Sequence, residues 1–338
     1  MINVQKMLII GAGRMGIRHA QGIVELDAIK SLLIADINNS ILNAASKTLS
    51  HSKCSFILVD SLIALGIDDI DICIIAATAG DRISLLKLAQ RVGAKTILVE
   101  KPLGQSLEQV IELNNFVIEQ KLNCFVNLNM RLYESFINLK YDLNRLTQLR
   151  GVKTITLNTG TLGIGANGIH YLDLLYFLLN ADSASFVAGE IDERVIPSGR
   201  GPQFGDFGGW AIIKFFNKGE FLANVFLSMS ASSTVFGAWD IVGPHGRVYL
   251  SEVEGKRIDT LRKDDSQLPF NRYFGDYLPP NEILIESPFL GDLTRKWIQG
   301  VIDGEKLLPE IGDSIKVHEL LFDWLGKSNT HKTIFPIT

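Results

Sequence analysis

The sequence predicts an α/β protein in two parts: an N-terminal doubly wound parallel sheet, then an α+β domain with an open, mostly antiparallel sheet. Two observations predict this fold class. In residues 1–125, short runs that are apolar throughout alternate with segments of helical periodicity, as strands buried on both faces do. From residue 152 to residue 251, longer strand-like runs follow one another with few helices between them. We therefore expect one domain over residues 1–125 and a second over residues 126–338.

Six apolar runs predict the strands of the first domain. The segments between them carry apolar residues at helical spacing. One such helix is predicted to end at Gly93, and the next to begin with Ser106 and Gln109 as a capping box. The predicted strands are residues 7–10, 31–35, 56–59, 70–76, 96–99 and 124–126.

The second domain is predicted from longer strands and a few helices. Asn217, Lys218 and Gly219 stand between two strand-like runs and predict a hairpin turn. Helical patterns return at 134–149, 170–180, 290–302 and 312–325. The predicted strands are residues 152–159, 184–196, 209–217, 220–230, 238–242 and 246–251.

The composition narrows the class of protein. The chain of 338 residues is 46% hydrophobic and has a formal net charge of −4, which gives no electrostatic reason to expect nucleic acid or an anionic membrane as a partner. No apolar run approaches the roughly 18 residues of a membrane span. The three cysteines lie far apart without a CxxC pair, which suits a reducing compartment and offers no zinc ligand set. We expect a cytoplasmic protein without a metal site.

A glycine-rich turn follows the first predicted strand and precedes a predicted helix. In such a turn the first glycine permits the tight bend, the second lets the backbone approach a pyrophosphate, and the third lets the helix pack on the strand. The helix N-terminus offers free N–H groups to the phosphates. The predicted cofactor-binding residues here are Gly11, Ala12, Gly13, Arg14, Met15 and Gly16.

An aspartate at the end of the second predicted strand indicates which dinucleotide binds. Asp36 follows Gly16 by 20 residues, where a carboxylate can hydrogen-bond the ribose hydroxyls of the adenosine. The same carboxylate would repel a 2′-phosphate, so we predict NAD rather than NADP. Arg14 weakens this preference slightly, because its guanidinium could meet a phosphate.

The stretch ILVEKPLG, residues 97–104, places charged residues directly after a buried strand. Ligands of a doubly wound sheet bind outside the carboxyl ends of its strands, so Glu100 and Lys101 are expected to face the cofactor cleft. A lysine there can donate a hydrogen bond to a substrate oxygen as hydride leaves the neighbouring carbon, or it can relay a proton. Pro102 fixes the turn, and its peptide bond can be cis.

The GAGRMG turn, the Glu-Lys-Pro sequence at a strand end and the α+β second half resemble the Gfo/Idh/MocA family of oxidoreductases. The resemblance covers the whole chain in architecture and the first 130 residues in motif detail. It implies a Rossmann-type N-terminal domain, NAD as cofactor, a catalytic Lys101, and Glu100 beside the nicotinamide ribose or amide. It also implies a homo-oligomer, dimer or tetramer, formed through the outer face of the open sheet.

Two further stretches are similar to family motifs on the cofactor side. VNLNMRLY, residues 126–133, resembles a family stretch with Asn and Arg two residues apart, which implies Asn129 beside the nicotinamide and Arg131 beside the substrate. Both could instead simply cap the next helix. In AATAGDRI, residues 76–83, the family often has Thr-Pro-Asn and then a histidine. This chain keeps only Thr78 of that pattern, and we expect Thr78 to touch the cofactor.

GIGANGIHYLDLLYFLL, residues 163–179, resembles the family's substrate-loop motif, in which Asp and His stand four residues apart. His170 matches the catalytic histidine, and Asp173 matches a downstream acid expected to contact substrate. Ala166 stands where the family has the aspartate, so His170 loses a carboxylate partner unless Asn167 or the substrate replaces it. A helix N-terminus favours neutral imidazole, which suits a base. Four glycines are expected to let backbone pass close to a ligand: Gly160, Gly163, Gly165 and Gly168.

Together these residues predict an NAD-dependent dehydrogenase acting on a secondary alcohol of a sugar, cyclitol or sugar nucleotide. Two alternatives stay open: an NAD-binding non-catalytic or regulatory protein, which Ala166 favours, and an NAD-dependent glycosidase of the same superfamily. A short-chain dehydrogenase is excluded, because none of the seven tyrosines has a lysine four residues later. Residues 199–209, which include Arg200, Gln203 and Asp206, form either a substrate loop or a connector.

Overall fold

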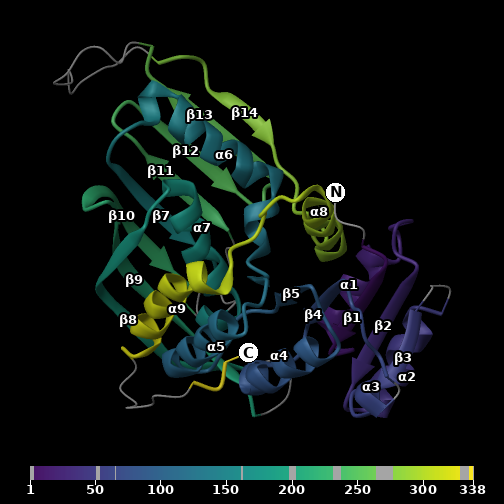
Figure 1. Cartoon of the computed structure of the whole chain (residues 1–338). Helices are drawn as coiled ribbons and strands as arrows, with labels where there is room; N and C mark the ends of the chain where they lie inside the picture. Colours follow the sequence, from purple (N-terminus) through teal and green to yellow (C-terminus); the bar gives the residue numbers. More distant parts are fainter. Residues whose placement is uncertain are drawn as a thin grey trace. The chain divides into compact units, whose positions relative to one another are not determined.

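The chain forms two compact units, each described here by itself. The computed structural model describes residues 4–50, 54–64, 66–160, 163–197, 203–230, 237–263, 277–327 and 335–337. Unit 1 is Met1–Leu132 with Pro288–Ile315, and unit 2 is Tyr133–Ser287 with Lys316–Ile337 (Figure 1). These units differ from the predicted division over residues 1–125 and 126–338, chiefly because the chain returns to unit 1 after residue 287.

Unit 1 is built on a six-stranded parallel sheet in the order β3-β2-β1-β4-β5-β6. The strand order reverses between β1 and β4, and the carboxyl ends at such a switch point are where doubly wound sheets bind ligands. The α/β prediction for this part is confirmed. The strands are β1 (Lys6–Ile10), β2 (Ser31–Asp36), β3 (Cys54–Leu58), β4 (Ile72–Ile75), β5 (Thr96–Val99) and β6 (Cys124–Val126).

The helices of unit 1 start and end largely where the sequence predicts. Gly93, with φ +69°, follows the end of α4. The hydroxyl of Ser106 accepts from the amide of Gln109 at 3.3 Å, but the side chain of Gln109 accepts from the amide of Gln105 rather than from that of Ser106. The helices between the strands are α1 (Arg14–Ile23), α2 (Asn39–Thr48), α3 (Ser61–Ala64), α4 (Arg82–Arg91) and α5 (Leu107–Glu119).

Helix α8 (Leu290–Asp303) belongs to unit 1 although it comes late in the chain. It crosses α1 so closely that a Cβ on Gly22 would lie 2.0 Å from the carbonyl oxygen of Gly291. Trp297 of α8 meets Phe125 of β6 edge-on, with ring centroids 6.1 Å apart. The sequence predicted this helix but not its unit, because a periodic pattern does not say which sheet an amphipathic helix covers.

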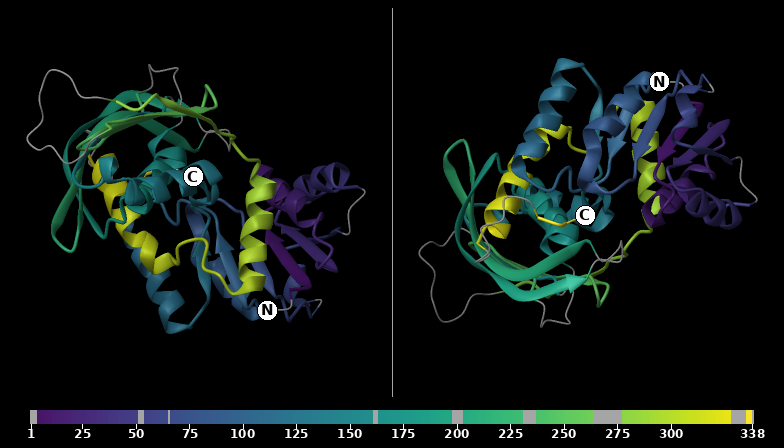
Figure 2. Two further views of the ribbon diagram at one scale, coloured as in Figure 1. Left: turned by 90° about the horizontal axis from the view of Figure 1, so that it is seen from above. Right: turned by 90° about the horizontal axis from the view of Figure 1, so that it is seen from below.

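Unit 2 contains an eight-stranded sheet in the order β14-β13-β12-β11-β7-β10-β9-β8, with β7 and β10 as its parallel pair. Helices α6 (Glu134–Arg145), α7 (Ile169–Leu179) and α9 (Ile311–Leu325) lie on one face of the curved sheet (Figure 2). This confirms the predicted α+β domain with a mostly antiparallel sheet. The strands are β7 (Lys153–Asn158), β8 (Ser183–Pro197), β9 (Gly205–Asn217), β10 (Glu220–Ser228), β11 (Ala238–Val242), β12 (Gly246–Ser251), β13 (Lys256–Leu261) and β14 (Asn281–Leu284).

One predicted turn is confirmed, and two strands were not predicted. Lys218 and Gly219 have φ of +49° and +82° and connect antiparallel β9 and β10, as a two-residue hairpin requires. The unpredicted strands are β13 and β14. The buried face of β13 holds Arg257 and Asp259, joined by two hydrogen bonds of 2.8 and 2.7 Å. Because its inward residues are charged, this strand reads as a polar loop in the sequence.

Candidate active site

The glycine turn lies at the carboxyl end of β1, and its three glycines have different surroundings. A Cβ on Gly11, whose φ is +107°, would lie 2.8 Å from the carbonyl carbon of Ala76, and one on Gly16 would lie 1.9 Å from the carbonyl oxygen of Gly11. A Cβ on Gly13 would meet nothing within 4 Å, which leaves the open side that a pyrophosphate needs. Helix α1 starts with no side-chain cap and no acidic residue in its first turn, so its N–H groups are available to phosphate. The turn fits a dinucleotide.

Asp36 lies at the edge of this turn, as the sequence predicts. One carboxylate oxygen accepts from the amide of Ala12 at 2.8 Å, and the other accepts from the amide of Asn38 at 2.9 Å. The next residue, Ile37, is 82% exposed and offers no positive charge to a 2′-phosphate. Arg14 is also exposed at the start of α1. The structure thus brings the predicted ribose-binding carboxylate and the predicted phosphate-binding turn together.

The Glu-Lys-Pro turn follows β5 at the same edge of the sheet, and the Lys101–Pro102 peptide bond is cis. Glu100 is buried, and its Oε1 accepts from the side-chain amide of Asn127 at 2.8 Å and lies 3.0 Å from Nε2 of His19. Burial alone would raise the pKa of the Glu100 carboxyl, but the hydrogen bond and charge of His19 and the charge of Lys101 hold this pKa well below its usual range. Glu100 is therefore an anion held from inside unit 1.

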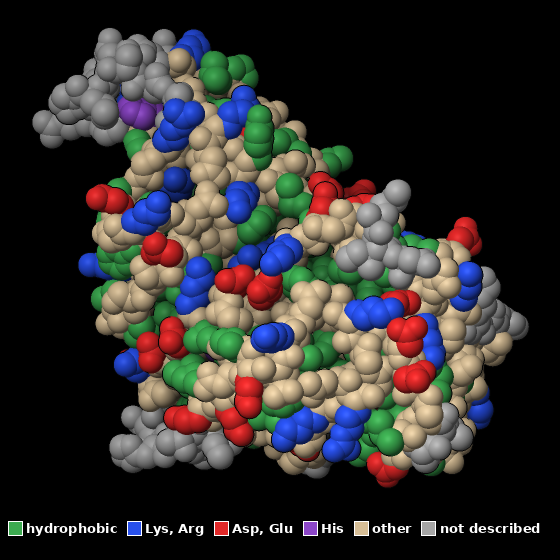
Figure 3. Space-filling model, in the orientation of Figure 1, with side chains coloured by type: hydrophobic (Ala, Val, Ile, Leu, Met, Phe, Trp, Pro, Cys, Tyr) green, Lys and Arg blue, Asp and Glu red, His purple; other side chains and the backbone are tan. Residues whose placement is uncertain are grey.

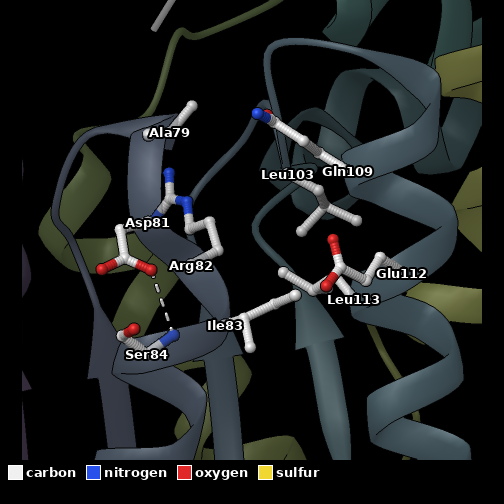
Figure 4. A pocket seen from close by; sticks show the side chains of 10 residues that line it. Ala79, Asp81, Arg82, Ile83, Ser84, Leu103, Gln109, Glu112 and Leu113 are labelled. Atoms are coloured by element: carbon white, nitrogen blue, oxygen red, sulfur yellow. Dashed lines mark hydrogen bonds between the residues drawn. The ribbon is translucent and has the colours of Figure 1, made fainter.

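A buried arginine supports the same turn. Arg82 donates from Nη1 to the carbonyl of Ile75 at 3.2 Å and from Nη2 to the carbonyl of Pro102 at 3.4 Å. It thereby joins the end of β4 to the turn that carries Lys101. Arg82 also lines a pocket of about 270 Å³ between the first turn of α4 and α5, where Asp81 caps α4 by accepting from the amide of Ser84 (Figure 4).

Three further predicted residues follow strands of the same sheet. Thr78 is exposed after β4, directly before the short 3₁₀ helix Ala79–Asp81. Asn129 and Arg131 are half-buried in the 3₁₀ helix Asn129–Leu132, which follows β6. The N-cap residue of α6 is Tyr133, so neither Asn129 nor Arg131 occupies that cap. All three come after carboxyl ends of parallel strands, the edge that also carries the glycine turn and Lys101.

In unit 2, His170 lies in the first turn of α7, and a π-helical turn, Ile164–Gly168, precedes it. The amides of Gly165 and Ala166 donate to the two carboxylate oxygens of Asp206 at 2.9 and 2.6 Å. The carboxylate of Asp206, from β9, thus binds the backbone of Ala166, the position where the family motif has its aspartate. Asp206 is buried in a strand rather than in an open loop, Gln203 is exposed, and Arg200 lies outside the described residues.

The glycines before His170 pack against protein atoms, so the prediction that they leave space for a ligand is wrong for three of them. A Cβ on Gly163, whose φ is +83°, would lie 2.3 Å from Oδ2 of Asp206. One on Gly165 would lie 2.6 Å from Ile337, and one on Gly168 would lie 2.8 Å from the sulfur of Met229. These glycines are needed for close packing around the start of α7.

Tyr171, the residue after His170, contacts a buried carboxyl group that the sequence did not indicate. Oε1 of Glu252 accepts from the hydroxyl of Tyr171 and from Nε1 of Trp239, both at 3.3 Å. Burial raises the pKa of Glu252 to about 7, although both hydrogen bonds act in the opposite direction. Asp173 is buried within α7, and Asn167 is half-buried in the preceding turn.

The sequence argument also missed His19, for which a signal was present. The buried residues of α1 include Gly16, His19, Ala20 and Ile23, at the spacing of one helix face. A histidine in that stripe has to find hydrogen-bond partners inside the protein. Among the described residues, no helix is long and apolar enough to cross a membrane, and none of the His, Cys, Asp and Glu side chains form a group of three or more that could hold a metal.

Comparisons with known proteins agree with this geometry. Residues 5–128 match the Gfo/Idh/MocA model, which describes an oxidoreductase family with an NAD-binding Rossmann fold. The comparison with curated proteins found no match.

Solved structures share the fold of the whole chain. A myo-inositol dehydrogenase from Corynebacterium glutamicum is 19% identical, with a TM-score of 0.67 over 97% of this chain and 98% of that one. A UDP-N-acetylglucosamine 3-dehydrogenase from Acidithiobacillus ferrooxidans is 15% identical, with a TM-score of 0.68 over 98% and 99%. An oxidoreductase from Agrobacterium radiobacter in complex with NAD+, L-tartaric acid and magnesium is 15% identical, with a TM-score of 0.71 over 97% of each chain. Residues 5–128 are thus similar to the NAD-binding Rossmann domain of the Gfo/Idh/MocA oxidoreductases, and the whole chain shares the fold of these solved structures.

Proposed function

We propose that this protein is an NAD-dependent dehydrogenase that transfers a hydride between the nicotinamide and a secondary alcohol of a sugar, cyclitol or sugar nucleotide. The observation that carries the proposal is the Glu-Lys-Pro turn, because its backbone and its glutamate are both held by buried polar side chains. Arg82 binds the carbonyl of Pro102, and His19 contacts Glu100. A lysine held so firmly at the ligand-binding edge of the sheet suits a reacting group better than a solvated surface charge.

The residues of this chain divide the chemistry between them. Bound NAD would supply the hydride acceptor. Lys101 donates a hydrogen bond to the substrate oxygen as negative charge develops on it. His170 accepts the hydroxyl proton as general base, which its place at a helix start favours by stabilising the neutral ring.

Other predicted residues bind rather than react. The turn from Gly11 to Gly16 binds the pyrophosphate and Asp36 binds the adenosine ribose, while Thr78, Glu100 and Asn129 border the nicotinamide end. Arg131, Asn167 and Asp173 serve the substrate. Because Asp173 is buried, we assign it a supporting position behind the residues that touch the substrate.

The substrate class rests on the fold neighbours and on the charge of the surface. The neighbours are named as enzymes of myo-inositol and of UDP-N-acetylglucosamine. Basic and acidic side chains are interspersed over the face shown in Figure 3, which supports a small-molecule substrate over a nucleic acid. A cytoplasmic location stays a prediction from the sequence, as does a homo-oligomer formed through the outer face of the sheet in unit 2.

A second candidate function is NAD binding without turnover, and Ala166 is the observation that favours it. The two functions give different results in one experiment. The protein is incubated with NAD and a panel of sugars, cyclitols and sugar nucleotides, and NADH formation is followed. Steady NADH formation supports the dehydrogenase, whereas NAD binding without NADH supports the binding protein. Sugar cleavage without net NADH would indicate the glycosidase.

A further inference from the structure

Three backbone amides hold the carboxylate of Asp206. Its Oδ1 accepts from the amides of Gly165 and Phe207 at 2.9 and 2.8 Å, and its Oδ2 accepts from the amide of Ala166 at 2.6 Å. A backbone amide can only donate a hydrogen bond, so each of the three contacts favours the ionised carboxylate over the protonated acid. Asp206 therefore carries a negative charge although it is only 6% exposed.

The chain leaves one fixed place for this carboxylate. Asp206 lies in β9 and pairs with Ile196 of β8, so the sheet holds its backbone. A Cβ on Gly163, whose φ is +83°, would lie 2.3 Å from Oδ2 of Asp206, so a side chain at residue 163 would displace the carboxylate. The negative charge thus stays at the start of the helical segment that leads to His170.

His170 lies in the same helical segment. The π-helical turn Ile164–Gly168 continues directly into α7, and His170 is the second residue of α7. Ala166, whose amide binds Asp206, precedes His170 by four residues, a rise of about 6 Å along a helix. His170 is only 9% exposed. Asp206 and His170 are therefore both buried at the first turns of one helical segment, where water screens their charges weakly.

The helix end at which His170 lies disfavours a positive charge. The amides of the first turn place partial positive charge there, which suits a neutral ring that accepts a proton. In the proposed reaction the hydroxyl proton of the alcohol moves to His170 while the hydride moves to the nicotinamide, so the ring becomes an imidazolium. Burial and the positive helix end both oppose this imidazolium. A fixed anion at the same helix end offsets that opposition.

We propose that Asp206 is the positioning and charge partner of His170: its carboxylate fixes the backbone that leads to His170 and stabilises the imidazolium that His170 forms. The role deepens the proposed dehydrogenase function, on which its catalytic meaning rests. Because Ala166 has no carboxylate, the negative charge at this helix end comes from β9 instead. Asp206 touches neither cofactor nor substrate in this assignment and acts through His170.

Other charged groups of the described residues lie around α7 and compete with Asp206 for this role. Asp173 is buried three residues after His170, and an i, i+3 pair shares one helix face, which makes Asp173 the strongest rival. Glu252, on the turn after β12, contacts Tyr171. Two ammonium groups lie over rings in the second half of α7: Lys140 of α6 over Phe177 at 3.8 Å and Lys316 of α9 over Tyr176 at 4.7 Å.

The pH at which the imidazolium of His170 loses its proton tests the assignment on the full chain without substrate. ¹⁵N NMR of histidine-labelled protein gives this midpoint, and the loss of signals in His170→Asn identifies His170. In Asp206→Asn the midpoint should fall by about one pH unit, because the anion that favours the imidazolium is gone. The matched control is Asp182→Asn, which removes an exposed carboxylate beyond the other end of α7 and should leave the midpoint unchanged.

A rescue separates the charge of Asp206 from its hold on the backbone. Ala166→Asp in the Asp206→Asn background returns a carboxylate to this helix end without the contact from β9, and the midpoint should return toward that of the wild type. A midpoint that does not move in folded Asp206→Asn, or that the rescue does not restore, overturns the proposal. A fall in Asp173→Asn with none in Asp206→Asn would assign the charge to Asp173 and overturn it as well.

If Asp206→Asn fails to fold, Ala166→Asp in the wild type replaces it. A second carboxylate at this helix end should raise the midpoint of His170, and an unchanged midpoint would count against the assignment. A wild type that binds NAD but forms no NADH would refute the proposed function while leaving the titration of His170 measurable. The two failures are thus distinguishable.

Discussion

At the scale of single residues, we expect Asp36 to decide between NAD and NADP. Its carboxylate is bonded to the amides of Ala12 and Asn38, which fixes a negative charge at the edge of the glycine turn. NAD should bind at least about tenfold more tightly than NADP, a difference of about 1.4 kcal/mol, because the 2′-phosphate meets this charge. Asp36→Asn should reduce the preference for NAD over NADP. The matched control is Asp27→Asn, which changes an exposed aspartate of the same unit and should leave the preference unchanged. Calorimetry that gives equal affinities for the wild type would refute the assignment.

Glu252 should give the protein a pH-dependent stability. Its pKa is raised from the ordinary value of 4.5 to about 7 in the folded protein. Between these two pH values the folded state binds more protons than the unfolded state. The contribution of Glu252 to the free energy of unfolding is therefore fully present below pH 4.5 and is lost as pH rises through 7. Glu252→Gln should remove this loss, which amounts to at most about 3 kcal/mol.

Urea unfolding at pH 5 and pH 8 measures the effect of Glu252 directly. The matched control is Glu254→Gln, which changes a more exposed glutamate two residues away. Wild type and Glu252→Gln should differ more at pH 8 than at pH 5. A constant difference between them would show that Glu252 is ionised throughout.

At the scale of elements, the start of α7 depends on a carboxylate from another strand. Asp206 of β9 holds the amides of Gly165 and Ala166. Ala166→Asp would place a second carboxylate beside it, so it should destabilise the wild type by about 1 kcal/mol but destabilise Asp206→Asn by less. Unfolding free energies of the wild type, Ala166→Asp, Asp206→Asn and the double variant give the coupling energy between the two positions. Strictly additive costs would mean that the two side chains do not meet.

We expect Ala166→Asp to keep turnover, whereas His170→Asn should lower turnover strongly.

Most elements could be predicted, and the failure to predict strand β13 has a physical cause. Strands β5 and β6 are buried and almost entirely apolar, so both were predicted with their observed bounds. Strand β13 was missed because Arg257 and Asp259 occupy its buried positions. Burial of a charged pair depends on partners far along the chain, here also Asp142 of α6, 2.8 Å from Arg257.

The residues of the candidate site could likewise be predicted only in part. Motif residues at strand ends, such as Asp36 and Lys101, could be predicted because the order of strands and turns places them. Arg82 and Glu252 could not be assigned, because their importance lies in partners that only the folded chain brings near. His19 could have been recognised as a buried residue from the stripe of α1, but its partners could not. Asp206 was placed in a stretch expected to be either a substrate loop or a connector, and in the structure its carboxylate binds the backbone before His170.

At the scale of the whole molecule, the sheet of unit 2 offers a surface for self-association. Trp210, Phe226 and Val242 alternate with buried neighbours on β9, β10 and β11 and are each about 40% exposed on the face away from the helices. We expect Phe226→Glu to dissociate the oligomer, because burying an unpaired carboxylate in the interface is unfavourable. Light scattering after gel filtration measures the mass. The control is Ile118→Glu in unit 1, which changes an apolar residue that is more exposed than Phe226. A monomeric wild type would contradict the oligomer.

The account as a whole depends on hydride transfer at Lys101. The most direct test follows NADH formation by the wild type and by Lys101→Ala with the panel of sugars, cyclitols and sugar nucleotides, and measures NAD affinity of both by calorimetry. We predict that the wild type forms NADH with at least one member and that Lys101→Ala loses roughly a hundredfold or more in turnover while its NAD affinity changes much less. A wild type that binds NAD and forms no NADH with any member, or a Lys101→Ala variant with unchanged turnover, would contradict it.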